Sequence, residues 1–566
     1  MTEHSYPWIG NYGSETLDWS MEIDPKPVFS FLEETVSRTP QAAALDFMGK
    51  VYSWAELGDL ADKFARGLQN LGVRKGVRVG LFLPNCPYFI IAYYAVLKIG
   101  GTVVNFNPLY AQSELEHQIE DSETEIMVTL DLAMLFEKME KCLSATRLEK
   151  LIICKFTDIL AFPKNLLFPI VKGKDMAKIR PQRRVVWFHD LIDNDGDYTP
   201  AEIDVMDDVA VLQYTGGTTG VPKGAMLTHC NLYSNVLQAY AHFPDPGGKQ
   251  ESMVAVLPFF HVFAMTVTMN LAIHAGMKIL TIPRFELDQT LKLIHKHKPD
   301  YMAAVPAIFN AMNNHKKISS FNLKSLKFCI SGGAPLPVEV KKKFEEKTGA
   351  VVVEGYGLTE ASPVTHVNPP CGENVAGSIG LPLPRTVVEI IDYEDKETPM
   401  PMGERGEVCI RGPQVMKGYW NKPEATADVL RKTEDGEMRL YTGDIGIMDE
   451  KGYVYIVDRI KDMIITNGYN VYPRNIEEGI YQHPSVEECI VAGLPHPQRG
   501  EIVKAWIKLK EGRELSADDL KTFLEDKLSK MEMPKLIEFR DEPLPKTLIG
   551  KLSRKDIVAQ ELEKKS

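Results

Sequence analysis

Short strand-like runs alternate with helical patterns over about 350 residues, and this alternation restricts the fold more than any other feature. Ile126–Leu130 is a compact apolar run, whereas apolar residues from Leu57 to Leu71 recur at helical spacing after the capping-box sequence Ser53-Trp54-Ala55-Glu56. Strands and helices that alternate in this way form βαβ units, so we expect an α/β fold with parallel-type sheets and helices on both faces. The predicted strands are Val77–Leu83, Val103–Phe106, Ile126–Leu130, Leu151–Cys154, Val209–Tyr214, Val254–Leu257, Ile279–Thr281, Tyr301–Ala304, Phe328–Ser331 and Val351–Glu354.

The pattern changes at about Ser378. From there to Val457, strand-like runs divided by Gly and Pro dominate, which predicts a β-rich subdomain with strands at Val387–Ile391, Glu407–Ile410 and Tyr453–Val457. After Asp458 the patterns are mixed and richer in lysine. We therefore expect a large N-terminal domain over residues 1–457, with its β-rich subdomain at about 378–457, and a small α+β C-terminal domain over residues 458–566.

Charge and cysteine usage restrict the class of protein. Lys and Arg number 65 against 77 Asp and Glu, a net charge of −12, which argues against nucleic acid as a partner. The eight cysteines are scattered singly, so neither a disulfide framework nor a zinc site is indicated, and a reducing cytosol is expected. The N-terminus has no signal-peptide pattern, and the apolar run Tyr88–Leu97 is about half a membrane span. These features predict a cytoplasmic, enzyme-sized protein.

The clearest candidate for a ligand site follows the strand that ends at Tyr214. The sequence from Tyr214 to Gly224 reads YTGGTTGVPKG, and its glycines and threonines can surround phosphate oxygens with backbone N–H groups and hydroxyls. Lys223 adds a positive charge. The segment is not a Walker loop, because no Gly-Lys in the chain is followed by Ser or Thr.

Two further glycine-bearing loops follow predicted strands, SGGAP at 331–335 and EGYGLTE at 354–360. Ligands in open parallel sheets bind beyond the carboxyl ends of the strands, so the three loops can converge on one site. The glycines allow the backbone to approach a flat base, and Tyr356 can stack on it. Thr359 can bind a phosphate, and Glu360 can hold a magnesium ion through oxygen.

Three more positions carry suitable groups but are ambiguous by themselves. Asp444 follows a tight turn and can reach a ribose diol, although an aspartate there is more often a turn residue. The charged run Asp458–Asp462 resembles a solvated linker, and Lys551 lies in a lysine-rich tail. Physical patterns alone do not select these residues.

In this order and spacing, the segments resemble the adenylate-forming superfamily, which includes acyl-CoA synthetases, luciferases and peptide-synthetase adenylation domains. The resemblance runs from about residue 30 to 560 and is greatest to bacterial long-chain-fatty-acid–CoA ligases. It is carried by the segments LQYTGGTTG, LPFFHVF, EGYGLTEASPVTH, RGPQVMKGYWNKPEAT and NGYNVYPRNIEE.

The resemblance implies a role for each matching residue. The phosphate loop comprises Thr215, Gly216, Gly217, Thr218, Thr219, Gly220 and Lys223. The adenine pocket comprises Gly333, Ala334, Glu354, Gly355 and Tyr356. Thr359 is expected on the α-phosphate, and Mg²⁺ is expected at Thr215 and Glu360. Asp444 and Arg459 are expected at the ribose, Lys461 at the hinge of a mobile C-terminal domain, Lys551 as the lysine required for adenylation, and His261 beside the acyl carboxylate.

Some positions depart from the pattern of the superfamily. Gly216 stands where many relatives have Ser, and Leu548-Ile549 and Leu552 replace smaller residues around Lys551. Ile465 stands where some relatives have a second lysine, so no catalytic role is expected there.

The implied activity is a two-step ligation in which a fatty carboxylate and ATP give an acyl-adenylate, and coenzyme A then displaces AMP. Three alternatives are open: an adenylating ligase for an aryl or shorter acid, an acyl-AMP ligase that loads a carrier protein, and a non-catalytic acyl or nucleotide binder. The sequence leaves chain length, oligomeric state and pathway open.

The segment 159–184 is not explained by this resemblance. It combines apolar residues with seven basic residues and a single acidic one, Asp175. Such a composition suits either peripheral contact with an anionic membrane or a basic surface loop with a few core anchors.

Overall fold

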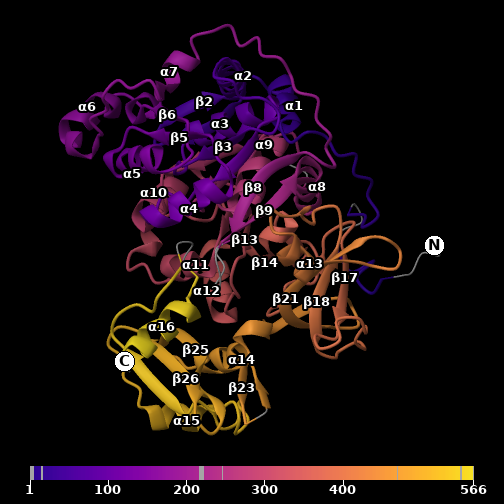
Figure 1. Ribbon diagram of the computed structural model, residues 1–566. Coiled ribbons are helices and arrows are strands. Elements are labelled where there is room, and N and C mark those ends of the chain that lie inside the picture. Colours follow the sequence, from indigo (N-terminus) through magenta and orange to yellow (C-terminus); the bar gives the residue numbers. More distant parts are fainter. Residues whose placement is uncertain are drawn as a thin grey trace.

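The computed structural model describes residues 6–13, 17–215, 222–244, 247–467, 469–547 and 551–564. In this part of the chain, two large and mainly parallel sheets are packed with helices, and two smaller sheets follow in the sequence (Figure 1). The predicted α/β class is confirmed.

The first large sheet has nine strands, of which those from β14 to β1 run parallel and the edge strands are antiparallel. In spatial order its strands are β16 (Leu381–Pro382), β15 (Val364–Val367), β14 (Val351–Gly357), β13 (Phe328–Ser331), β12 (Tyr301–Ala304), β10 (Ser252–Ala255), β11 (Lys278–Thr281), β1 (Ala43–Phe47) and β2 (Lys50–Ser53).

The second large sheet has eight strands, and those from β8 to β7 run parallel. In spatial order its strands are β19 (Gly418–Tyr419), β9 (Lys223–Thr228), β8 (Val209–Thr215), β4 (Thr102–Asn105), β3 (Arg78–Leu81), β5 (Ile126–Leu130), β6 (Lys150–Cys154) and β7 (Val185–Trp187). β9 returns antiparallel to β8 and places Lys223 opposite Thr215, a hairpin pairing that the sequence patterns did not predict.

Helices separate and cover these sheets. Those before residue 430 are α1 (Ser30–Arg38), α2 (Trp54–Asn70), α3 (Pro87–Lys98), α4 (Gln112–Asp121), α5 (Ala133–Ala145), α6 (Lys164–Val171), α7 (Phe188–Leu191), α8 (His229–Tyr240), α9 (Leu271–Ala275), α10 (Leu287–His297), α11 (Pro306–Asn313), α12 (Val338–Thr348) and α13 (Pro423–Val429). The predicted capping box is present. The Ser53 hydroxyl accepts a hydrogen bond from the Glu56 backbone N–H, and the Glu56 carboxylate accepts one from the Ser53 backbone N–H.

α2 and α3 lie between the two large sheets. α2 contacts β1, β2 and α3, and α3 in turn contacts β3 and β4. α3 contains the apolar run Tyr88–Leu97 and is buried at every position, as a helix that is apolar all round requires. Among the described residues, no helix is long and apolar enough to cross a bilayer.

The third sheet is antiparallel and contains the strands predicted for the β-rich segment. Its order is β17 (Val387–Ile391), β18 (Gly406–Arg411), β21 (Met438–Met448) and β20 (Leu430–Lys432), and β22 (Val454–Arg459) also pairs with β21. β16 and β19 come from the same stretch of sequence but join the two large sheets, so the β-rich segment is anchored to both.

The fourth sheet lies in the C-terminal part of the chain, shown in orange to yellow below the rest in Figure 1. Its strands are β24 (Tyr469–Val471), β23 (Ile464–Thr466), β26 (Gly500–Leu509), β25 (Val486–His496) and β27 (Leu536–Arg540), accompanied by α14 (Pro473–Tyr481), α15 (Ala517–Leu524) and α16 (Arg554–Glu563).

The hydrophobic core follows the same division. One continuous cluster of buried side chains extends from Trp8 to Val454. Two smaller clusters lie between Ile464 and Ile557. We call the described residues up to 457 the body and those from 458 the C-terminal region; the exact boundary stays a prediction.

Candidate active site

Four neighbouring parallel strands of the first sheet, β10, β12, β13 and β14, end at the same edge. The residues that follow them include His261, Val305 and Gly333, and Tyr356 lies at the end of β14 itself. These residues line a cavity of about 1680 Å³ between the body and the C-terminal region. Thr215 and Lys223, which flank the first predicted loop, line the same cavity, so the described parts of the three predicted loops meet there.

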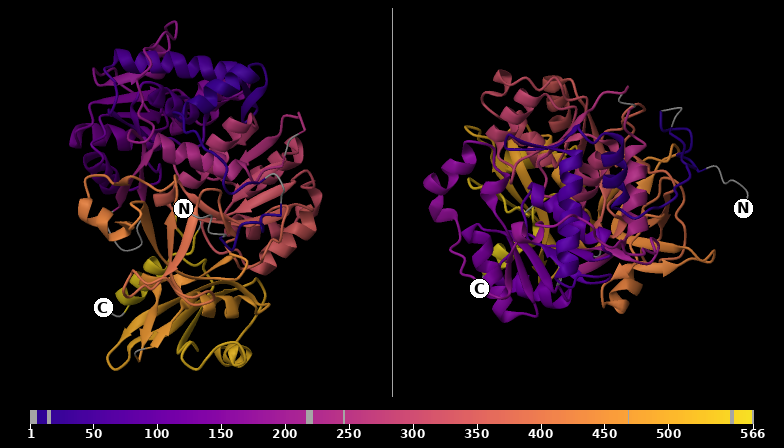
Figure 2. Two further views of the ribbon diagram at one scale, coloured as in Figure 1. Left: turned by 90° about the vertical axis from the view of Figure 1, so that its right-hand side faces the viewer. Right: turned by 90° about the horizontal axis from the view of Figure 1, so that it is seen from above.

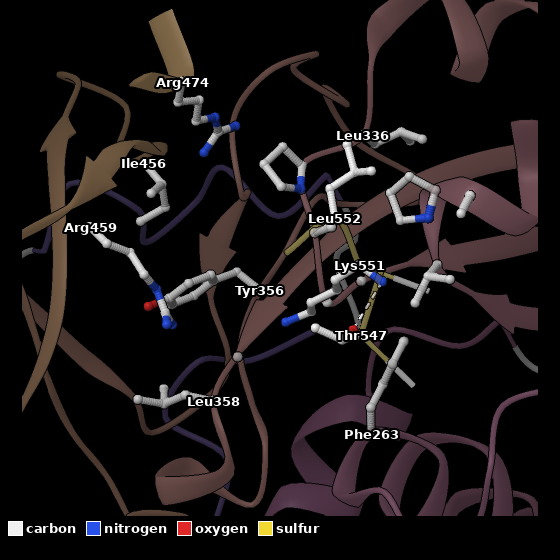
Figure 3. A pocket seen from close by; sticks show the side chains of 18 of the residues that line it. Phe263, Leu336, Tyr356, Leu358, Ile456, Arg459, Arg474, Thr547, Lys551 and Leu552 are labelled. Carbon is white, nitrogen blue, oxygen red and sulfur yellow. Dashed lines mark hydrogen bonds between the residues drawn. The ribbon is translucent and has the colours of Figure 1, made fainter. Parts of the chain in front are cut away.

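A carboxylate at one side of the cavity is held by two donors. Asp444 on β21 lies opposite Arg459 on β22, and the Arg459 Nε donates to Asp444 Oδ1 at 2.8 Å. The Tyr356 hydroxyl donates to Asp444 Oδ2. Burial raises the pKa of Tyr356 well above its usual value, and the negative charge of Asp444 adds to this, so the phenol remains a donor. Figure 3 shows the Tyr356 and Arg459 side chains next to each other.

A second carboxylate, Glu360, lies in the short 3₁₀ helix Thr359–Ala361 directly after β14. The Tyr419 hydroxyl donates to Glu360 Oε1 at 2.6 Å, and the Met416 backbone N–H donates to the Glu360 carbonyl at 2.8 Å. β19 pairs with β9, which brings the Lys223 ammonium to 5.0 Å from the centroid of the Tyr419 ring. One tyrosine thus contacts both a carboxylate and a lysine of the predicted site.

The C-terminal region contributes Lys551. Its backbone N–H donates to the Thr547 hydroxyl at 3.2 Å, and its side chain extends into the cavity (Figure 3). A Cβ at Gly333, where φ is +82°, would lie 3.3 Å from Lys551 Cε, so glycine leaves room for the lysine. Burial, aided by the positive charge of Arg459, lowers the pKa of Lys551 to about 8.

Arg474, at the start of α14, also points into the cavity from the C-terminal region (Figure 3). Its charge acts on Glu354, which is buried in the middle of β14 and accepts a hydrogen bond from the Leu336 backbone N–H at 3.3 Å. Burial raises the pKa of Glu354 to about 7, and the charge of Arg474 acts in the opposite direction. Glu354 therefore gains or loses its charge close to neutral pH.

His261 adjoins the apolar part of the cavity. Burial and the nearby positive charge of Lys551 lower the pKa of His261 to about 4, so its imidazole is neutral at physiological pH. Apolar side chains continue the cavity beyond it: Val262, Phe263, Val267, Val305, Ile330 and Leu336. This arrangement suits a ligand with a polar head and a hydrocarbon tail.

Lys461 lies in the short 3₁₀ helix Ile460–Asp462, between β22 and the C-terminal sheet. Desolvation by its surroundings and repulsion by Arg459 lower the pKa of Lys461, and the charges of Asp444 and Glu360 oppose this shift. The predicted hinge residue is therefore electrostatically linked to both carboxylates.

The described candidate residues all line the one cavity: Thr215, Lys223, His261, Gly333, Ala334, Glu354, Gly355, Tyr356, Thr359, Glu360, Asp444, Arg459, Lys461 and Lys551. Gly216, Gly217, Thr218, Thr219 and Gly220 lie outside the described residues. Sequence reasoning missed Tyr419 and Arg474. Both occur in the segments that carry the resemblance. A buried carboxylate needs a hydrogen-bond donor or a cation nearby, so the search for partners of Glu360 and Glu354 could have identified them.

Oxygen atoms suited to Mg²⁺ are present at the predicted positions. The Thr215 hydroxyl and the Glu360 carboxylate line the same cavity and are hard oxygen ligands. Within the described ranges, no group of three or more His, Cys, Asp or Glu side chains could hold a metal by itself. These donors fit an ion that takes its remaining ligands from phosphates and water.

Comparison with known proteins adds an independent line of evidence. The AMP-binding enzyme family model matches residues 32–420, and the model of the AMP-binding enzyme C-terminal domain matches residues 475–551. The Bacillus subtilis (strain 168) protein named long-chain-fatty-acid–CoA ligase is 43% identical over 560 residues, 98% of each chain. The Escherichia coli O6:H1 protein of the same name is 37% identical over 564 residues, 97% of each chain. The crystal structure of ATP-bound MatB from Rhodopseudomonas palustris matches with a TM-score of 0.83 and 28% identity, over 96% of this chain and 100% of that chain.

Proposed function

The chain belongs to the AMP-binding enzyme family, and we propose that it is a long-chain-fatty-acid–CoA ligase. A fatty carboxylate oxygen attacks the α-phosphorus of ATP, and pyrophosphate leaves with the electrons of the broken P–O bond. The thiol sulfur of coenzyme A then attacks the acyl carbon of the adenylate, loses its proton, and displaces AMP.

The observation that carries this proposal is the 43% identity to the Bacillus subtilis ligase over almost the full length of both chains. The cavity gives physical support, since it joins a polar part with carboxylates and lysines to an apolar part. A fatty acid needs both environments, because its carboxylate must meet the nucleotide while its chain leaves water.

The positions of the polar groups suggest their tasks. We propose that Asp444, oriented by Tyr356 and Arg459, binds the ribose hydroxyls. Thr359 and Lys223 would bind phosphate oxygens, and Glu354, Gly355, Gly333 and Ala334 would border the adenine. Thr215 and Glu360 would hold Mg²⁺, which supplies positive charge to the phosphates.

Lys551 and His261 lie where the carboxylate and the α-phosphate would meet. The ammonium of Lys551 offsets negative charge that develops during adenylation, and the neutral His261 adjoins the carboxylate without adding charge. No protein nucleophile is needed, because the acyl-adenylate is a mixed carboxylic–phosphoric anhydride from which AMP is a good leaving group. The contribution of the protein is positioning and charge stabilisation.

We further propose that the C-terminal region is a mobile domain that turns at Lys461. In the arrangement described above, Lys551 extends into the polar part of the cavity from the C-terminal side. Withdrawal of Lys551 would open that side for the thiol of coenzyme A.

The proposed function is tested by AMP release with carboxylates of graded chain length, in the presence and absence of coenzyme A. We expect release that depends on coenzyme A and is fastest with long-chain fatty acids. Preference for an aryl or short acid would assign the chain to another adenylating ligase.

Two further outcomes separate the remaining alternatives. Formation of acyl-AMP without a thioester when only coenzyme A is supplied would indicate transfer to a carrier protein. Absence of ATP–pyrophosphate exchange with every acid would indicate a non-catalytic binder.

A further inference from the structure

The helix α6 has an apolar face that points away from the protein. Leu166 and Ile170, and likewise Leu167 and Val171, are four positions apart and therefore share a face. Together with Phe162, these side chains are 50–80% exposed. No residue of α6 is buried. The apolar face of an ordinary surface helix packs against the core, whereas that of α6 is turned to the solvent.

The clustering of these residues is unusual for this molecule. Five of the 18 large hydrophobic side chains that are exposed in the described chain fall between Phe162 and Val171. The others are scattered, as single exposed hydrophobic residues usually are. A local concentration of this kind indicates a contact surface.

The position of α6 is fixed from its other side. The ring of Phe168 packs on that of Phe156, with centroids 4.9 Å apart, and the Lys164 ammonium donates to the Met48 carbonyl at 2.8 Å. α6 lies at the periphery of the body (Figures 1 and 2), and none of its residues lines the cavity. The exposed apolar face is therefore presented by an anchored helix and is separate from the active site.

Basic side chains follow the apolar face in the sequence. Exposed cations are Lys172, Lys174, Lys178, Arg180, Arg183 and Arg184. Among the described residues, the only ion pair within this group joins Lys172 to Asp175 at 3.7 Å. The segment 159–184 carries seven basic residues and one acidic residue, whereas the whole chain has a net charge of −12.

We propose that residues 162–184 form a docking surface for an anionic lipid bilayer. A bilayer offers negative headgroups directly above an apolar interior, which complements cations beside an apolar helix face. A second copy of this chain that docked through the same face would place cations opposite cations, which is less favourable. α6 lies in the interface, and the following lysines and arginines bind headgroup phosphates.

Co-sedimentation of the full chain with vesicles tests this proposal. One set of vesicles contains equal parts of phosphatidylglycerol and phosphatidylcholine, and the other contains phosphatidylcholine alone. We expect binding to the anionic set that weakens as salt rises from about 0.01 M to about 0.15 M, because the Debye length falls from about 30 Å to about 8 Å. Equal binding to both sets at low salt, or none to either, would overturn the proposal.

Two variants separate the apolar and the basic contributions. Leu166→Ser with Ile170→Ser removes apolar insertion and should weaken binding about tenfold or more at every salt concentration. Lys172→Gln with Lys174→Gln and Lys178→Gln should weaken vesicle binding by about 10- to 100-fold at low salt and much less at high salt. Each cation near an anionic surface raises the binding constant by up to about fivefold.

Matched controls use residues of the same exposure elsewhere. Met206→Ser replaces another exposed hydrophobic residue, and Lys249→Gln with Lys324→Gln and Lys530→Gln removes the same charge. The assignment would be contradicted if both the serine variant of α6 and the glutamine variant of the lysines still bound anionic vesicles normally. It would also be contradicted if the control variants lost binding to the same extent. A concentration-dependent dimer without lipid that the α6 variant abolishes would assign the surface to a second copy instead. Far-UV circular dichroism and ligase activity on a water-soluble acid show that each variant is folded, so a loss of binding is attributable to the surface.

Discussion

The body and the C-terminal region contribute to the cavity in different ways. In the body, a continuous core from Trp8 to Val454 supports β14, which carries Tyr356 near its end and leads into the 3₁₀ helix of Glu360, and β21, which carries Asp444. Each of these side chains is held by a neighbour in the same body or, for Asp444, also by Arg459 at the boundary. These groups form a site that is organised before any ligand enters.

The C-terminal region has its own smaller cores and brings charge to the cavity through Lys551 and Arg474. No ion pair is described for the Lys551 side chain, and its burial is unfavourable for the ammonium, as the lowered pKa shows. A group of this kind can enter and leave with less disruption than one fixed by several hydrogen bonds. In the proposed function, this difference assigns binding to the body and activation to the C-terminal region.

The largest expected effect tests the side chains that the body holds in place. Glu360→Ala should remove a metal ligand of the body and lower the turnover of Mg-ATP by about 1000-fold while the fold is retained. The measurement is ATP–pyrophosphate exchange over a range of magnesium concentrations, with Glu360→Asp as the control that keeps a carboxylate. Near-normal exchange by the alanine variant at saturating magnesium would remove Glu360 from the site.

The second prediction tests the part of the cavity that the C-terminal region contributes. Lys551→Ala should slow formation of acyl-AMP by about 100-fold or more, the scale of losing one well-placed electrostatic stabiliser. Added acyl-AMP should still be converted to acyl-CoA at close to the normal rate. The two half-reactions are measured separately, and Lys530→Ala serves as the control because Lys530 is an exposed lysine of the same region. Equal loss in both half-reactions would break the comparison.

A third change concerns the junction of the two units. Lys461→Pro restricts φ at that position and the conformation of the residue before it. Acyl-AMP should form while its transfer to coenzyme A slows by about tenfold or more, the reverse of the Lys551 variant. Lys461→Ala removes the same ammonium without restricting the backbone and separates the two causes. A proline variant that is slowed only in adenylation would contradict the assignment of the hinge.

The smallest effect belongs to the ribose contact. Asp444→Ala should raise the KM for ATP by about tenfold with a smaller change in kcat, because this contact is equally strong before and in the transition state. Initial rates over a range of ATP concentrations give the two constants, and Asp444→Asn retains part of the hydrogen bonding. An unchanged KM would show that Asp444 does not bind the nucleotide.

Much of the body could be predicted from the sequence because its strands are short apolar runs with clear boundaries. β5 coincides with the predicted Ile126–Leu130, and β12 and β13 coincide with their predicted ranges. β9 was missed because KGAMLT lacks both a continuous apolar run and a regular alternation. Its partner strand, not its local sequence, determines its conformation.

The candidate site divides in the same way. The glycine-bearing loops could be located from residue types and spacing, whereas Asp444 and Lys551 were assigned only by resemblance. Their chemistry depends on neighbours far away in the sequence, such as Tyr356 for Asp444 and Gly333 for Lys551. Tyr419 illustrates the same limit, since its two contacts require the pairing of β19 with β9.

The lowered pKa of Lys551 couples nucleotide binding to protons. With a pKa of about 8, this side chain is about half neutral at pH 8 in the cavity, whereas an ordinary lysine is almost fully charged. The negative charge of ATP phosphates favours the ammonium, so ATP binding near pH 8 should take up as much as about half a proton per molecule. We therefore expect the affinity for ATP to decrease as the pH rises above about 8. Calorimetry of ATP binding in buffers with different ionisation enthalpies measures this proton uptake, which Lys551→Met should abolish.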